Sequence, residues 1–334
     1  MLKEIEIQNF RCFEQIKISG FERVNLIGGK NNAGKTALLE ALFLNVAPDA
    51  SSLAILRDLR REPSEALQAM PNRAWDNLFY AQIKDKFIVI IGKDYNNNTE
   101  RLEIKVEINS VRYKINFEFM RNEDQSTWSL TEVSAQGLMR YYSSLDEVPI
   151  IPSWIRISGK ELTQAYDKAR LDEKDSEVLK AFQIIDPTIE SVESFTIGEP
   201  TLYLRRKGEK RLPLSLFGDA INRVAEIILK LVNSQYQTLL IDEIENGIHY
   251  KSQREFWRVL FRLAVELDTQ IFATTHSLEM LQAFADVGLE LNQECSSAYF
   301  ELAKKPKTDQ IIGIRRDLET LNYALEHKKG VRGE

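Results

Sequence analysis

The feature that most constrains the fold of this chain is a glycine-rich octapeptide between an apolar segment and a segment of helix-forming residues. The apolar segment is residues 24–27, and residues 37–43 contain no helix breaker. Glycines let such a loop turn tightly, so that its backbone N–H groups and the N-terminus of the next helix face one bound phosphate. The octapeptide is Gly29, Lys30, Asn31, Asn32, Ala33, Gly34, Lys35 and Thr36.

The last two residues of the octapeptide indicate the chemistry of the ligand. Lysine at this place reaches the β- and γ-phosphates of a nucleotide, and the following hydroxyl ligates Mg²⁺. We therefore predict that the whole octapeptide binds ATP, that Lys35 also acts in catalysis, and that Thr36 holds Mg²⁺. A plain glycine-rich turn, the alternative, gives no reason for Lys-Thr to follow. The chain lacks the Asn-Lys-x-Asp run expected of a GTPase.

Two later apolar segments end in residues that complete this chemistry. Residues 238–241 lead into Asp242 and Glu243, and residues 270–274 lead toward His276. Ligands of open α/β sheets lie at the carboxyl ends of the strands. Asp242 is therefore predicted to hold Mg²⁺, and Glu243 to accept a proton from the attacking water. A structural histidine is the usual interpretation at a strand end, but the position of His276 after Asp242 favours a catalytic role.

Composition and charge limit the class of protein. Of 334 residues, 43% are hydrophobic and 28% charged, which is typical of a folded chain. No apolar stretch could cross a bilayer and no signal-peptide pattern is visible, so we expect a cytoplasmic protein without membrane contact. The net charge of −6 gives no global case for nucleic-acid binding. A basic cluster at residues 205–211, within an apparent hairpin around Gly208 (the basic hairpin), leaves DNA possible, although a solvated turn is the favoured interpretation.

Between the phosphate loop and Asp242 the hydrophobic pattern changes twice. Residues 102–108 and 111–119 alternate with period two around Asn109-Ser110, which predicts a hairpin of an antiparallel sheet. Helical spacing follows from about residue 135, and Ser158–Glu161 has the pattern of a capping box. Further predicted elements are a second short helix ending near Pro187, a strand at 298–302 and a helix at 317–326.

The order of these motifs resembles an ABC-type ATPase head. The run from Ile7 to Phe13, the Gly-Lys-Asn-Asn-x-Gly-Lys-Thr loop and the run from Asp242 to His249 are similar to the RecF/SMC-like ATPases. They are most similar to the OLD-type AAA-family ATPases of bacterial antiphage systems. The resemblance covers about residues 1–44 and 212–326. It implies an α/β P-loop NTPase with a mixed central sheet, an antiparallel β subdomain and a helical insertion.

The resemblance also implies domain boundaries and a dimer. Residues 1–134 and 186–334 would form the head, with the antiparallel part at about 84–134 and a helical insertion lobe at 135–185. Ser215, Gly218 and Asp219 would form the signature segment that contacts ATP bound to a second copy, so that two ATP molecules lie in a homodimer interface. Leu216 and Ala220 replace small residues usual in this segment, which would weaken or reshape the contact. Gln68 and Gln82 are candidates for the Q-loop glutamine.

Two functions follow as hypotheses. OLD-type relatives often carry a Toprim nuclease domain, and the segment after His276 is too short to supply one. The leading hypothesis is therefore an ATPase subunit that dimerises on ATP and controls a separate effector, such as a nuclease or toxin, in a bacterial defence system. The alternative is a RecF-like repair clamp or scaffold that binds DNA in an ATP-dependent way. Arg11 is either a nucleotide contact or part of a surface salt bridge.

Overall fold

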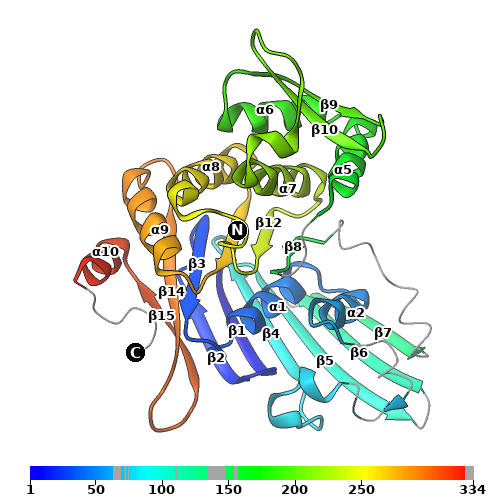
Figure 1. Ribbon diagram of the computed structural model, residues 1–334. Helices are drawn as coiled ribbons and strands as arrows, with labels where there is room; N and C mark the ends of the chain where they lie inside the picture. Colours follow the sequence, from blue (N-terminus) through cyan, green and yellow to red (C-terminus); the bar gives the residue numbers. More distant parts are fainter. Residues whose placement is uncertain are drawn as a thin grey trace.

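The phosphate loop lies at the edge of a mixed six-stranded sheet in the computed structural model (Figure 1). The structure describes residues 1–62, 69–70, 73, 75–109, 112–122, 124–133, 148–153 and 157–327. The strand order of this central sheet is β15-β14-β3-β13-β12-β8. Its strands are β3 (Val24–Gly29), β8 (Ile150–Ile151), β12 (Thr238–Ile241), β13 (Gln270–Thr274), β14 (Ser297–Lys304) and β15 (Ile311–Arg316).

Parallel pairing brings the functional segments to one edge of the central sheet. Strand β3 pairs in parallel with β13 on one side and β14 on the other, and β13 pairs in parallel with β12. The phosphate loop, Asp242 and His276 therefore all follow the carboxyl ends of neighbouring parallel strands. The predicted bounds of β12 and β13 are confirmed.

An antiparallel six-stranded sheet forms the second layer, with strand order β2-β1-β4-β5-β6-β7. The predicted hairpin is confirmed, because Ile104 pairs with Phe117 and Ile108 with Tyr113. The final strand of this sheet was not singled out from the sequence. The strands are β1 (Leu2–Phe10), β2 (Phe13–Ser19), β4 (Ile88–Asp94), β5 (Thr99–Asn109), β6 (Arg112–Arg121) and β7 (Asp124–Val133).

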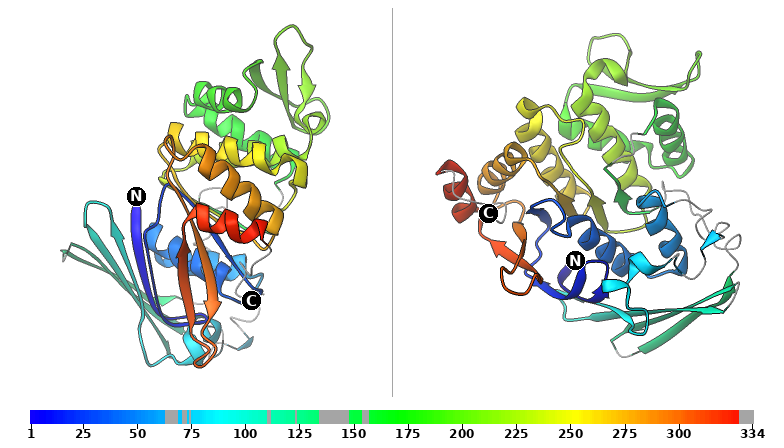
Figure 2. Two further views of the ribbon diagram at one scale, coloured as in Figure 1. Left: turned by 90° about the vertical axis from the view of Figure 1, so that its left-hand side faces the viewer. Right: turned by 60° about the horizontal axis from the view of Figure 1, so that its bottom comes forward.

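Helices pack on both faces of the central sheet. Helix α1 (Lys35–Val46) contacts strands of both six-stranded sheets and so lies between them (Figures 1 and 2). The remaining α-helices are α2 (Ala50–Leu59), α5 (Gly159–Leu171), α6 (Asp175–Ile185), α7 (Asp219–Asn233), α8 (Gln253–Glu266), α9 (Leu278–Glu290) and α10 (Leu318–Glu326). Short 3-10 turns are η2 (Asp76–Leu78), η3 (Tyr80–Gln82), η6 (Leu214–Phe217) and η7 (Tyr250–Ser252).

Alternate residues of the central strands enter two separate hydrophobic cores. Leu239 and Ile241 pack with α7, α8 and α9, whereas Leu240 between them packs with α1 and the antiparallel sheet. Ile271 and Phe272 divide in the same way. Successive side chains of a strand point to opposite faces, so the buried central strands stabilise both layers at once.

A third, three-stranded sheet packs with helices at the end of the molecule shown uppermost in Figure 1. Its order is β11-β10-β9, formed by β9 (Ile189–Phe195), β10 (Thr201–Arg206) and β11 (Leu212–Pro213). Helices α5 and α6 contact β9, and both also contact α7. The segment predicted as a helical insertion therefore packs with strands that follow residue 185 as one unit; residues 134–147 lie outside the described part.

Candidate nucleotide site

The backbone of the octapeptide requires glycine at two places. Gly29 has φ 140° and Gly34 has φ 93°, where other residues are strained. A Cβ at Gly29 would lie 2.5 Å from the carbonyl oxygen of Leu302, and one at Gly34 would lie 2.9 Å from Sγ of Cys12. Either substitution would push the loop away from its supports. Ala33 is buried beneath the loop, while Lys30, Asn31 and Asn32 are exposed.

Lys35 begins α1 and folds back over the loop. Its Nζ donates to the carbonyl oxygens of Gly29 (2.9 Å) and Lys30 (3.1 Å). Its ammonium group is thereby held above the loop, on the side of the cavity described below. The loop residues predicted to bind phosphate therefore lie around Lys35, which is predicted to contact the same phosphates.

Asp242 lies directly after β12, against the threonine that follows the lysine. Oγ1 of Thr36 is 3.3 Å from one carboxylate oxygen of Asp242, and Oγ1 of Thr274 donates to the other at 2.6 Å. Burial raises the pKa of Asp242, and the hydrogen bond from Thr274 opposes that shift. A buried carboxylate beside a hydroxyl is a pair of hard oxygen donors. Mg²⁺ prefers such donors, and it commonly takes one or two from protein together with substrate phosphates and water.

The donor set fits Mg²⁺ better than a metal held by protein alone. Among the residues that the structure describes, no group of three or more His, Cys, Asp or Glu could enclose a metal ion. Thr36 and Asp242 therefore form a partial ligand set, which suits an ion that shares its ligands with a nucleotide.

Glu243 adopts a strained backbone conformation next to Asp242. Its φ is 48°, and its N–H donates to Oγ1 of Thr274 at 2.8 Å. Nδ2 of Asn246 donates to Oε2 of Glu243 at 3.0 Å. Its side chain is 40% exposed. These contacts fix the carboxylate at the cavity while leaving it open to water.

His276 lies close to the two glutamates that follow Asp242. Its Nδ1 is 2.9 Å from Oε1 of Glu245 and 4.0 Å from Oε1 of Glu243. The backbone N–H of His276 also donates to Oε1 of Glu245, at 2.9 Å. Glu245, which sequence reasoning did not single out, thus holds the histidine through both its backbone and its ring. The Asp-Glu-x-Glu spacing after β12 is the signal that could have found it.

A cavity of about 800 Å³ is lined by Lys35, Thr36, Asp242 and Glu243, and His276 is not part of its lining. The candidate Arg11 and the further arginine Arg60 also lie in its wall. The fully buried Glu40 accepts from Nε of Arg11 at 2.9 Å and from Nε of Arg60 at 2.6 Å. Arg60 and Glu40 were not predicted; Glu40 lies one turn after Thr36 on an otherwise apolar helix, which was the available signal. The predicted residues that line the cavity are Asn31, Asn32, Gly34, Lys35, Thr36, Asp242 and Glu243.

The predicted signature segment is elsewhere in the same chain. Ser215 lies in η6, Gly218 has φ 91°, and Asp219 begins α7. None of these three residues lines the nucleotide cavity. Ser215 lines a second, smaller cavity, and Leu216 beside it is 68% exposed.

Other candidates have simpler surroundings. Gln82 is exposed in η3, and Gln68 lies outside the described residues. In the basic hairpin, Arg206 pairs with Asp186 at 2.6 Å and Arg211 with Glu193 at 2.7 Å, while Arg205 is 3.4 Å from Glu190. Acids therefore neutralise much of the charge that could attract DNA. No helix in the described part of the chain is long and apolar enough to cross a membrane.

Comparison with protein families finds one match that spans most of the chain. A model of the AAA ATPase domain matches residues 1–144 and 142–281. The "ATP/GTP phosphatase" of Helicobacter pylori is 26% identical over an alignment 385 positions long, which covers all of both chains. The DNA replication and repair protein RecF of Bacillus cereus (strain G9842) is 28% identical over 115 residues, which are 34% of this chain and 25% of RecF.

Comparison with solved structures supports the fold. The SMC head domain from Thermotoga maritima superposes with a TM-score of 0.50 and 12% sequence identity, covering 95% of this chain and 99% of that domain. The predicted α/β class with an ATPase-head architecture is confirmed. The narrower likeness to OLD-type ATPases stays a prediction.

Proposed function

Because this chain belongs to the AAA ATPase domain family and has a RecF/SMC-like ATPase head, we propose that it hydrolyses ATP in the 800 Å³ cavity and dimerises on ATP. The observation that carries the proposal is the convergence of Lys35, Thr36, Asp242 and Glu243 on that one cavity. These groups come from two parts of the sequence, because 206 positions separate Thr36 from Asp242.

Each polar group has a task in phosphoryl transfer to water. Lys35 would move from the loop carbonyls onto the β- and γ-phosphates, and the loop N–H groups would bind the phosphate oxygens. Thr36 and Asp242 would hold Mg²⁺, which supplies charge stabilisation at the phosphates. Glu243 would accept the proton of the attacking water, and His276 would contact the γ-phosphate.

Two arginines add positive charge to the same wall. The buried carboxylate of Glu40 orients Arg11 and Arg60, and both side chains line the cavity. A triphosphate carries several negative charges, so guanidinium groups fixed before binding reduce the reorganisation that catalysis requires. This favours a nucleotide contact for Arg11, and the salt bridge to Glu40 is what positions it.

The dimer supplies the groups that this cavity lacks. Ser215, Gly218 and Asp219 would approach the γ-phosphate of ATP bound to a second copy. Their separation from the nucleotide cavity of their own chain and the positive φ of Gly218 at the start of α7 support this arrangement. A helix N-terminus with exposed N–H groups favours an anionic ligand.

The first test uses Glu243→Gln. This variant keeps the size of the side chain but removes the base, so turnover should fall by about 10²–10⁴-fold while ATP binding persists. ATP should then trap a dimer, measured by light scattering with and without ATP. Glu266→Gln, an exposed site at the end of α8 near the opposite edge of the central sheet, is the matched control. A variant that stays monomeric at saturating ATP would rule out the ATP-closed dimer.

We further propose that the output of the dimer is control of a separate effector protein, a nuclease or toxin, in a bacterial defence system, and that the protein acts in the cytoplasm. The described residues contain the proposed ATPase site and no second catalytic centre, which supports a separate protein as the effector. Co-purification with the product of a neighbouring gene, dependent on ATP, is the expected result. DNA degradation by the pure chain with Mg²⁺ would contradict it.

A second candidate is an ATP-dependent DNA clamp or scaffold. The similarity to a segment of RecF favours it, whereas the net charge of −6 and the paired arginines of the basic hairpin weigh against it. A mobility shift of DNA that requires ATP and weakens steeply with salt would support the clamp.

A further inference from the structure

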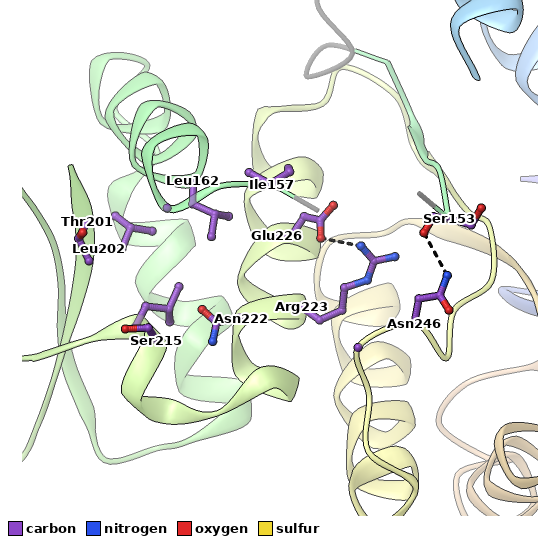
Figure 3. A pocket seen from close by; sticks show the side chains of 13 residues that line it. Ser153, Ile157, Leu162, Thr201, Leu202, Ser215, Asn222, Arg223, Glu226 and Asn246 are labelled. Carbon is purple, nitrogen blue, oxygen red and sulfur yellow. Dashed lines mark hydrogen bonds and ion pairs between the residues drawn. The ribbon is translucent and has the colours of Figure 1, made fainter. Parts of the chain in front are cut away.

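A second cavity, of about 300 Å³, lies between α5, β10, η6, α7 and the loop after Glu243 (Figure 3). Its walls include the buried side chains of Leu162, Leu202 and Leu214. Its volume is at the lower end of the range for small-molecule sites. The cavity thus has an apolar wall suited to a small ligand.

A buried ion pair lies on the other side of this cavity. Nη1 of Arg223 is 2.6 Å from Oε2 of Glu226, and the two side chains are 8% and 7% exposed. Nε of Arg223 is buried without a hydrogen-bond partner. Burial raises the pKa of Glu226, and the Arg223 guanidinium opposes the shift.

Arg223 has spare hydrogen-bonding capacity inside this cavity. The pair is joined by one hydrogen bond, from Nη1 of Arg223 to Oε2 of Glu226, and Nε of Arg223 is left without a partner. Buried ion pairs overcome their desolvation cost only when further hydrogen bonds satisfy the remaining atoms. A ligand with a negative and a positive group side by side would pair with both partners and add no net charge to the cavity.

We propose that this cavity binds a small zwitterion, an α-amino acid with an apolar side chain. Its carboxylate would pair with the guanidinium of Arg223, and its ammonium group with Oε1 of Glu226. Its side chain would pack on Leu162, Leu202 and Leu214. A simple anion fits less well, because Glu226 already neutralises Arg223 and would repel it.

The cavity also touches the nucleotide machinery. Nδ2 of Asn246, a residue of the cavity wall, donates to the carbonyl oxygen of Ser153 and to Oε2 of Glu243, both at 3.0 Å. Ser215 of the proposed signature segment lines the opposite wall (Figure 3). Occupancy should therefore change ATP turnover by altering the hold of Asn246 on Glu243, an effect that rests on the proposed function.

Calorimetry with free amino acids tests the site directly. L-leucine, L-methionine and L-phenylalanine are titrated into the full chain, beside 4-methylpentanoate, which lacks the ammonium group of leucine, and 3-methylbutylamine, which lacks its carboxylate. At least one amino acid should bind saturably, one per chain, and each half-ligand about 10- to 100-fold more weakly, as expected for loss of a charged hydrogen bond. No saturable binding up to about 10 mM, or equal binding of a half-ligand, overturns the proposal.

Two variants and one matched control assign the binding to this cavity. Glu226→Gln should weaken amino-acid binding about 10-fold or more, and Leu162→Phe should block the cavity. Glu290→Gln makes the same chemical change at an exposed pair with Arg258 and should bind as the wild type does. Thermal unfolding verifies that each variant folds. Unchanged binding in both cavity variants would place the ligand elsewhere and refute the site.

The ATPase-deficient Lys35→Ala variant separates the two proposals. This variant should bind the amino acid as the wild type does, so the amino-acid site is tested independently of ATP hydrolysis. If the amino acid binds to the wild type but loses its site in Lys35→Ala, the cavity assignment is wrong.

Discussion

At the scale of single residues, the site is a set of side chains whose positions are fixed by hydrogen-bonded partners. Asp242 is held by Thr274, Glu243 by Asn246 and His276 by Glu245. Thr274 belongs to β13 of the central sheet, and Glu245 and Asn246 lie in the segment that follows β12. The groups proposed to act on ATP are therefore oriented before any ligand arrives, which lowers the cost of reaching the transition state.

Lys35→Ala should abolish ATP binding or nearly so. Its ammonium group is the cation at the centre of the loop, and the loop carbonyls it now contacts would face the phosphates without compensation. Binding of a fluorescent ATP analogue measures the loss. Lys307→Ala, an exposed lysine in the β14–β15 turn, should bind as the wild type does. If Lys35→Ala binds ATP as tightly as the wild type, the loop is not part of the nucleotide site.

Cys295 gives a prediction for alkaline pH. Burial raises the pKa of this thiol from 9.0 to about 11. Because the folded state holds the proton more tightly, this stabilisation is complete below pH 9 and is lost as pH rises through about 11. The loss should reach about 2–3 kcal/mol. Urea unfolding under reducing conditions should show a steeper fall for the wild type than for Cys295→Ala; parallel curves would contradict this.

A residue of the site could be predicted only where the neighbouring sequence has a recognisable pattern. Thr36, Asp242 and Glu243 follow apolar strands or a glycine-rich loop, so sequence order alone placed them at one sheet edge. Arg60 and Glu40 could not be paired this way, because their contact spans two helices and depends on how α1 packs against α2. Hydrophobic periodicity carries no information about which distant polar residues will meet.

At the scale of elements, strands with a marked hydrophobic pattern were predicted, and strands whose burial depends on their neighbours were not. Strands β12 and β13 are continuous apolar runs, and Ser158 caps α5 with the expected reciprocal bonds to Glu161. Strand β15 was missed, because its burial follows from pairing with β14 rather than from its own alternation. The predicted hairpin around Gly208 is confirmed as β10 and β11, whereas β9, which packs against α5 and α6, was not predicted.

Ser158→Ala should destabilise the protein by about 1 kcal/mol. The side chain accepts from the N–H of Glu161, and the Glu161 carboxylate accepts from the N–H of Ser158, so the substitution removes one of two reciprocal cap bonds. Chemical denaturation measures the change. Ser191→Ala, in β9 rather than at a cap, serves for comparison and should have a smaller effect. An unchanged midpoint for Ser158→Ala would mean that the cap adds nothing to the fold.

At the scale of the whole molecule, we propose that one chain carries two halves of a site, which are completed only in a dimer. The nucleotide cavity contains the loop, Asp242 and Glu243, while Ser215 borders the other cavity. Closed symmetric dimers commonly complete such sites, because the same two patches are presented by both copies.

Mixing two inactive variants tests this composite site. Lys35→Ala damages one half and Ser215→Arg the other, so a mixed dimer contains one intact site and one doubly damaged site. With random exchange, activity should recover to about a quarter of the wild-type level. Mixing Lys35→Ala with Glu243→Gln is the control, because both changes affect the same half and no site is restored. Equal activity in the two mixtures would show that each chain works alone.

The place of β3 in the central sheet also has a consequence during synthesis on the ribosome. This early strand is flanked on both sides by β13 (Gln270–Thr274) and β14 (Ser297–Lys304), which are made much later than β3. At a synthesis rate of about 5–20 residues per second, β3 waits roughly 10–50 s for its neighbours. Long-range pairing of this kind is slow to form. A nascent chain that lacks these strands would therefore neither consume ATP nor capture a finished copy, and the nucleotide site would assemble only after β13 and β14 had been made.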